Sequence, residues 1–276
     1  MAQNFLTDYY PLSREDALGI AVSFTFWTTL YIIVEKLPLP LKPKGAELSR
    51  SQALDVKNRI ISMLHGLVLA IFSAPEFYFF PGSCGDPITT YEKRLIYTAV
   101  GYFLYDFFAM AYYGLLDAAM SFHHWTCIIG MSLPLTYGMS GNYVVQGMFV
   151  AEASNPFMHI RIILRQYGLR YTRAYETMEI LFMIIYIFGR IIMGTYTAWS
   201  TSWCENNHWV IKTAALGLLV QTAFFVQQML GILRKRFKEI SDRKRLRIKN
   251  RWFEPLNREE LEKLGINEKK EVQMAL

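Results

Sequence analysis

The sequence predicts an all-α integral membrane protein with seven transmembrane helices. Hydrophobic residues make up 53% of its 276 positions and charged residues only 19%, whereas soluble domains average about 25% charged residues. Several apolar runs approach the roughly 20 residues that a helix needs to cross ~30 Å of hydrocarbon. The seven runs are 17–34, 58–80, 95–116, 122–139, 142–164, 177–200 and 209–233. We expect no cleavable signal peptide, so the first run would itself direct membrane insertion.

Lysine and arginine are distributed unevenly between the predicted loops. They gather after the first run, after the fifth run and in the tail, and seven spans place these three regions on one side of the membrane. By the positive-inside rule this side is cytoplasmic, and the N-terminal segment 1–16 is lumenal or outside. The net charge of +6 therefore indicates membrane orientation, and we expect no nucleic-acid partner.

Two of the three cysteines lie in loops on the predicted non-cytoplasmic side. Cys84 follows the second run and Cys204 follows the sixth, so the two either form a disulfide or remain free thiols. Cys127 lies within the fourth run, where we expect a small packing residue. The basic tail, residues 236–276, is either an amphipathic helix up to Trp252 or a solvated segment, and it is a candidate docking site for a protein partner.

The fourth and fifth runs differ from the others in how they are bounded. They are joined by the tight turn at residues 138–142, GMSGN, which makes them antiparallel neighbours. Pro156 interrupts the fifth run, and it has no N–H to bond the carbonyl of Glu152, four residues earlier. We therefore expect this helix to bend beside the Glu152 carboxylate.

Polar side chains occur within most of these apolar runs. An ionisable side chain facing lipid at the bilayer centre costs about 2.5–3.5 kcal/mol, so we expect these groups to face inward. We predict that they converge on one enclosed site near the cytoplasmic leaflet. The candidates are Arg59, Ser62, His65, Asp106, His123, His124, Glu152, Ser154, Asn155 and Arg190. Eleven-residue spacing also places Glu179 and Arg190 on one face of an ideal α-helix.

The chemistry suggested by these residues is acyl transfer from a thioester. An imidazole of His123 or His124 can act as nucleophile or general base, and the carboxylates of Asp106 and Glu152 can orient it. A purely structural role of the two carboxylates, as ion partners of Arg190 or of the histidines, stays open. The histidine spacing fits no metal motif, so we expect no metal. The seven-span receptor class is excluded, because the last run lacks Asn-Pro-x-x-Tyr.

Several of these motifs resemble the TLC-domain family, which includes ceramide synthases and translocating-chain-associated membrane proteins. They are Arg59-x-x-Ser62-x-x-His65, Asp106 in YFLYDFFAM, His123-His124, and Glu152-x-Ser154-Asn155-Pro156-Phe157 with Arg161. The last motif is more similar to the TLC-domain-containing 4 type than to ceramide synthases. The resemblance implies a barrel of six helices over residues 55–235, preceded by one additional helix at 17–34.

The resemblance also implies a function. Ceramide synthases use a histidine pair, at the position of His123 and His124, for N-acylation by acyl-CoA. Their motif continues His-Asp-x-Ser-Asp, where this chain has AEASN at 151–155. We expect a protein that holds an acyl lipid in the barrel and acts in lipid metabolism or homeostasis. Whether it is an enzyme stays open: it is either an acyl-CoA-dependent N-acyltransferase, with acyl-CoA as co-substrate and no other cofactor, or a non-catalytic subunit of a membrane complex. The expected location is the endoplasmic reticulum, with the mitochondrial inner membrane as the alternative.

Overall fold

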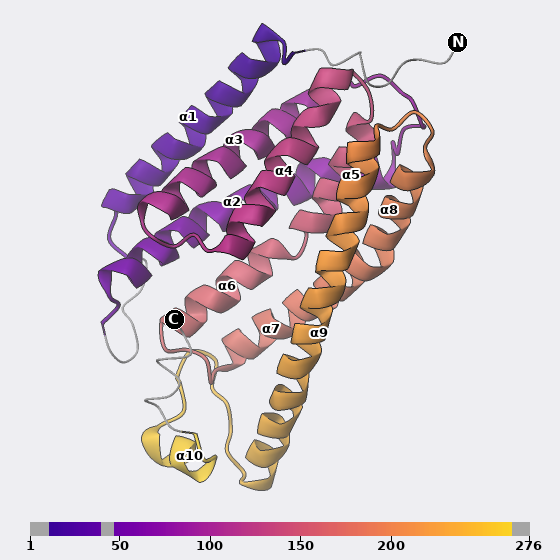
Figure 1. The fold of residues 1–276 in the computed structure, drawn as a ribbon. Coiled ribbons are helices and arrows are strands. Elements are labelled where there is room, and N and C mark those ends of the chain that lie inside the picture. Colours follow the sequence, from indigo (N-terminus) through magenta and orange to yellow (C-terminus); the bar gives the residue numbers. More distant parts are fainter. Residues whose placement is uncertain (1–10, 40–46, 267–276) are drawn as a thin grey trace.

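The computed structural model describes residues 11–39 and 47–266, and this part of the chain is a bundle of helices (Figure 1). The elements are α1 (Arg14–Lys36), α2 (Arg50–Tyr78), α3 (Thr90–Tyr112), α4 (Ala118–Tyr137), α5 (Gly141–Glu152), α6 (Asn155–Gln166), α7 (Arg173–Tyr186), the π-helix η1 (Ile187–Met193), α8 (Gly194–Trp203), α9 (Trp209–Arg245) and α10 (Arg258–Lys263). In the described ranges, β-structure is limited to an isolated bridge between Pro87 and Met139. The prediction of an all-α protein is confirmed.

Polar residues start the helices where loops change to apolar runs. The side chain of Ser13 accepts a hydrogen bond from the N–H of Asp16 at the start of α1, and Asp117 accepts one from Met120 at the start of α4. Helices α2 and α3 each begin with a capping box. These caps satisfy N–H groups that have no partner within the helix, so the sequence itself sets where these helices begin.

Helix α1 packs against α3 along a seam with glycine on both helices. A Cβ atom at Gly19 would overlap the ring of Tyr97, and one at Gly101 would overlap Ser23. The two helices therefore approach more closely than larger residues would permit. The other face of α1 is apolar and exposed, as expected for a helix at the edge of the bundle that contacts lipid.

In the part of the chain that the structure describes, five segments are long and apolar enough to cross a membrane: α1, α2, α3, the continuous stretch Arg173–Trp203, and α9. The chain is thus a multi-pass membrane protein. Helix α4 lies outside this group because His123, His124 and Pro134 lower its hydropathy. Helices α5 and α6 lie outside it because each has 12 residues. The break between them falls just before Pro156, as predicted, and the number of seven spans remains a prediction.

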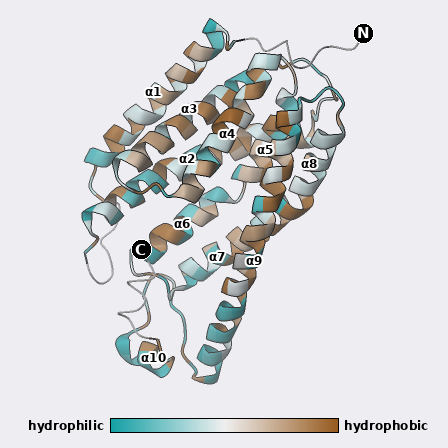
Figure 2. Cartoon of the chain, viewed as in Figure 1, coloured by the Kyte–Doolittle hydropathy of each residue, from teal (hydrophilic) through white to brown (hydrophobic). Residues whose placement is uncertain are grey.

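The loops gather at the two ends of the bundle. At the end predicted to be non-cytoplasmic, a disulfide joins Cys84 to Cys204, whose Cα atoms are 5.4 Å apart. Of the two expectations for these cysteines, the bridge is therefore confirmed. At the opposite end α9 continues beyond the bundle (Figure 1). Figure 2 shows that hydrophilic residues dominate this extension of α9 and the short helix α10.

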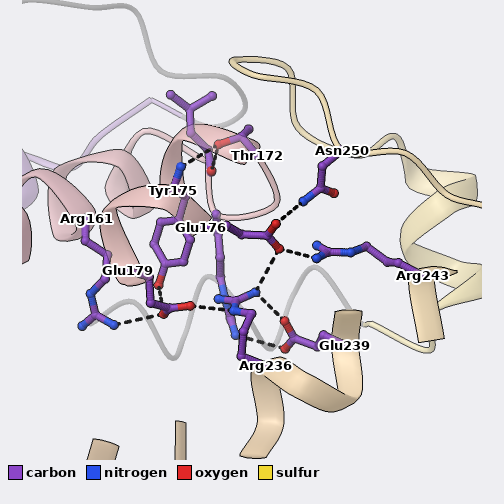
Figure 3. A network of polar contacts seen from close by, with 11 residues as sticks. Arg161, Thr172, Tyr175, Glu176, Glu179, Arg236, Glu239, Arg243 and Asn250 are labelled. Atoms are coloured by element: carbon purple, nitrogen blue, oxygen red, sulfur yellow. Dashed lines mark hydrogen bonds and ion pairs between the residues drawn. The ribbon is translucent and has the colours of Figure 1, made fainter. Parts of the chain in front are cut away.

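A buried ionic network ties this extension of α9 to α7 (Figure 3). Arg236 Nε donates to Glu179 Oε2 at 2.6 Å, and Arg236 Nη1 donates to Glu239 Oε2 at 2.6 Å. Arg161 Nη1 reaches the other Glu179 oxygen at 3.1 Å. Further members are Tyr175, Glu176, Arg243 and Asn250. The network fixes α9 against α7 at the predicted cytoplasmic end.

The tail folds back onto its own chain. Its backbone carbonyls at Arg251 and Trp252 accept hydrogen bonds from the N–H groups at the start of α7. Leu256 and Leu261 pack with Tyr171 in a small apolar cluster. Of the two alternatives for the tail, a helix up to Trp252 is not formed. Helix α9 ends at Arg245, and Trp252 lies in an irregular segment with its side chain exposed.

Candidate functional site

A cavity of about 170 Å³ lies between α4, α5, η1, α8 and α9. Most of its wall is apolar or small, and its polar lining residues include His123, Glu152, Asn155 and Arg190. His123 lies near the start of α4 and Glu152 at the end of α5, so these residues occupy the predicted cytoplasmic half of the bundle. The apolar remainder extends toward the start of α9. An elongated molecule with one polar end matches this distribution.

The two adjacent histidines have different surroundings. His124 is 1% exposed, and its Nε2 lies 2.9 Å from Asp106 Oδ2 while its Nδ1 lies 2.8 Å from the carbonyl oxygen of Met120. A carbonyl only accepts, so Nδ1 carries a hydrogen. The contact between Nε2 and the carboxyl group of Asp106 therefore holds one shared proton. His124 is fully hydrogen-bonded and does not line the cavity.

Asp106 is held on its other side by α2. Asn58 Nδ2 donates to Asp106 Oδ1 at 2.7 Å, and Tyr105 donates to Asn58 Oδ1 at 2.6 Å. The set of Asn58, Tyr105, Asp106 and His124 thus links α2, α3 and α4 through buried hydrogen bonds. Each member has a partner, which is the pattern of a group that fixes helix positions.

His123 faces the cavity. In the described part of the chain its polar contact is with the Sγ atom of Cys127, 3.8 Å from the ring nitrogens, which is weak. Its imidazole is therefore available to a molecule in the cavity. The ring of Phe103 lies against His65, His123 and His124, with centroids 5.9, 5.8 and 5.6 Å away. Phe103 connects the fully bonded histidine to the cavity wall.

Glu152 is positioned by the break between α5 and α6. Asn155 Nδ2 donates to Glu152 Oε2 at 2.8 Å, and His65 Nδ1 lies 4.0 Å from the same oxygen. A Cβ atom at Gly66 would lie only 3.1 Å from Oε2, so the glycine makes room for the carboxyl group. His65 is itself fixed by stacking on the ring of Tyr102, with centroids 3.6 Å apart. Glu152 therefore combines contact with α2 and access to the cavity.

Arg190 is presented by the π-helix η1, a type of element that is frequent at functional sites. Its Nη2 donates to the carbonyl oxygen of Ala151 at 2.9 Å, and its guanidinium carbon lies 5.5 Å from the centroid of the Tyr186 ring. Its Nε is buried and makes no hydrogen bond with any described residue. Asp106 and Glu152 were expected to pair either with Arg190 or with the histidines. No described carboxylate lies within 4.0 Å of Arg190, whereas Asp106 pairs with His124 at 2.9 Å and Glu152 lies 4.0 Å from His65. Glu179, predicted on the same helix face, bonds Arg236 and Arg161.

Residues 55–233 match the family model described as the TLC domain. The chain belongs to the TLC-domain family. This TLC-domain protein is also similar to TLC domain-containing protein 2 of Danio rerio, with 26% identity over 222 residues, which cover 77% of this chain and 86% of the relative. A closer likeness to the TLC-domain-containing 4 type remains a prediction.

Three further predicted site residues of the TLC-domain protein lie apart from the cavity wall. Arg59 pairs with Asp55 at 2.7 Å and is partly exposed, and Ser62 donates to the backbone carbonyl of Asn58. Ser154 is buried, and its hydroxyl has no hydrogen-bond partner among the described residues. A direct role in the cavity for these three residues stays a prediction.

Sequence reasoning missed Asn58, which holds Asp106. A signal for it was available, because Asn58, Ser62 and His65 follow one another at i, i+4 and i+7 and share a helix face. It also missed Gly147, which lines the cavity and whose missing side chain leaves space. A glycine within a helix has no comparable sequence signal.

Proposed function

We propose that this TLC-domain protein binds an acyl lipid in the cavity between α4, α5 and α9 and acts in membrane lipid metabolism or homeostasis. The observation that carries the proposal is the cavity itself, with apolar walls and a polar group made of His123, Glu152, Asn155 and Arg190. An acyl chain satisfies the apolar part, and a polar end group satisfies the rest. A polar ligand of similar length would leave most of the apolar wall without an apolar partner.

The proposal is tested by filling the cavity without disturbing the fold. Gly147 lines the cavity, and a Cβ atom built there meets no atom within 4 Å. Gly217 also meets none, but it lies on the exposed surface of α9 and does not line the cavity. Gly147→Leu and Gly217→Leu are therefore a matched pair that place the same side chain inside and outside the cavity.

Native mass spectrometry of the purified protein gives the readout. The wild type and Gly217→Leu are expected to retain an acyl lipid at similar occupancy, whereas Gly147→Leu loses most of it because leucine occupies the space. Equal lipid occupancy in all three proteins would show that bound lipid lies elsewhere, and the proposal would fail.

Acyl-CoA-dependent N-acyl transfer is a second candidate, supported by the free imidazole of His123 on the cavity wall. In this reaction the thioester C–S bond breaks, an amide bond forms, and coenzyme A leaves as its thiol with a proton. His123 would take the proton from the attacking amine or carry the acyl group, and Glu152 would support it. His124 would act indirectly, by holding α4 against Asp106.

This candidate is tested with palmitoyl-CoA and a sphingoid base in proteoliposomes. His123→Ala is expected to abolish product formation with little loss of folded protein, while Cys127→Ala, a change beside the same ring, retains most of it. Activity that survives in His123→Ala would exclude this catalytic role and leave the non-catalytic lipid-binding version.

The non-catalytic version makes the protein a lipid-binding subunit of a larger membrane complex, with a partner on the C-terminal tail. The described tail packs on its own chain through Leu256 and Leu261, so its order requires no partner. Residence in the endoplasmic reticulum, with the mitochondrial inner membrane as the alternative, is likewise a proposal. Imaging of the tagged full-length protein against markers of both membranes decides between them.

A further inference from the structure

Arg190 stands out among the cavity residues because its hydrogen-bonding capacity is largely unused. An arginine guanidinium carries five N–H donors. Among the described residues Arg190 makes one hydrogen bond, from Nη2 to the Ala151 carbonyl, and its buried Nε makes none. Buried donors without a partner are rare in folded proteins, and each calls for a ligand or ordered water.

The depth of Arg190 in the membrane makes its missing hydrogen bonds costly in free energy. Arg190 lies near the middle of the candidate span Arg173–Trp203, in the π-helix η1. Charged side chains at such depth face the bundle interior and pair with a counter-charge. No described carboxylate lies within 4.0 Å of the Arg190 guanidinium to form an ion pair. Glu152, which lines the same cavity, has its Oε2 engaged by Asn155 and 4.0 Å from His65 on α2.

We infer that Arg190 binds the carboxylate of a free fatty acid whose hydrocarbon chain lies in the cavity. This inference rests on the proposed lipid-binding function and names the end group of the lipid. The planar guanidinium matches a carboxylate, and such charge-assisted hydrogen bonds are about twice as strong as neutral ones. The apolar lining beyond Arg190, including Val144, Ile211 and Leu218, accommodates the chain.

A carboxylate fits this site better than a phosphate. Within the described ranges, Arg190 is the single lysine or arginine that lines the cavity. A phosphate monoester carries about −1.5 to −2 charges at pH 7, which one buried guanidinium does not neutralise. The neighbouring Glu152 would oppose the excess negative charge. A carboxylate carries one charge and balances Arg190 alone.

The test compares ligands that differ only in the end group. The full-length protein in lipid nanodiscs is photolabelled with a diazirine analogue of palmitate, and unlabelled palmitate or methyl palmitate competes. Loss of the charge-assisted hydrogen bonds makes the ester a weaker competitor by about ten- to a hundredfold. This preference is expected to disappear in Arg190→Leu and to persist in part in Arg190→Lys, which keeps the charge.

Each other outcome overturns the inference. Equal competition by acid and ester in the wild type shows that no carboxylate is recognised, and this comparison needs no variant. A preference for the acid that survives in Arg190→Leu assigns recognition to another residue. Stronger competition by lysophosphatidic acid than by palmitate assigns the site to a phosphate. If Gly147→Leu abolishes the labelling but acid and ester compete equally, the proposed lipid binding stands and only the inference about Arg190 fails. If labelling is unchanged in Gly147→Leu, both proposals fail.

Discussion

Arg236 and Arg190 are two arginines on helices of the same bundle, and their surroundings are opposite. Arg236 is buried and bonds the carboxylates of Glu179 and Glu239 at 2.6 Å each. Arg190 bonds one backbone carbonyl and leaves a buried Nε without a partner in the described part of the chain. The first arginine is paired within the protein, and the second is paired only in part.

This difference separates structural from ligand-binding polar groups. A fully paired buried charge holds helices together, because removing one partner leaves the other uncompensated. A partly paired charge on a cavity wall contributes little to the stability of the fold, and its unused N–H donors are available to a ligand. His124 and His123 repeat the same contrast, since the first is hydrogen-bonded on both nitrogens and the second faces the cavity.

The largest expected effect is the loss of the paired arginine. Arg236→Met leaves Glu179 with Arg161 and Tyr175 as partners but without its shortest ion pair, and we expect the free energy of unfolding to fall by about 3 kcal/mol. Reversible unfolding in mixed micelles measures the change. Arg245→Met is the matched control on the same helix, because its side chain is 76% exposed, and it should change stability by less than about 0.5 kcal/mol. Equal effects of the two variants would contradict a structural role for the network.

The second effect distinguishes the adjacent histidines. His124→Ala leaves Asp106 and the Met120 carbonyl without their partner, whereas His123→Ala removes the same number of atoms and no strong hydrogen bond. We expect His124→Ala to be less stable than His123→Ala by about 2 kcal/mol, measured by the same unfolding experiment. If His123→Ala were equally or more destabilised, the division of roles between the two residues would be wrong.

The smallest expected effect on stability belongs to the partly paired arginine. Arg190→Leu removes one hydrogen bond to Ala151 and also removes a charge that lacks a counter-charge, so the two contributions largely cancel. We expect the lipid-free protein to change by less than about 1 kcal/mol. The same variant should lose bound lipid in native mass spectrometry. A loss of several kcal/mol in lipid-free protein would place Arg190 with Arg236 as a structural residue.

Local features of the fold were predictable from the sequence. Composition and apolar runs indicate a helical membrane protein, and Pro156 marks the break between α5 and α6 because it lacks an N–H. The placement of Cys84 and Cys204 in two loops on the same side made their disulfide one of the two open expectations. Each of these features depends on local sequence or on how many times the chain crosses the membrane.

The partners of the polar residues were harder to predict. Spacing on one helix placed Glu179 and Arg190 on the same face, but η1 has the wider turns of a π-helix, so the ideal α-helical spacing does not apply across it. The pairing of Glu179 with Arg236 depends on how far α9 extends past α7 and how each helix is rotated. Neither quantity is encoded in the spacing of residues along a single helix.

The most direct test of lipid binding is an experimental density map of the full-length protein in lipid nanodiscs. We predict continuous elongated density between α4, α5 and α9, with one end beside Arg190 and His123 and the remainder along the apolar wall. The same map of Gly147→Leu should lack this density while the helices keep their positions. A wild-type map in which side chains fill the cavity, with no density beside Arg190, would contradict the account.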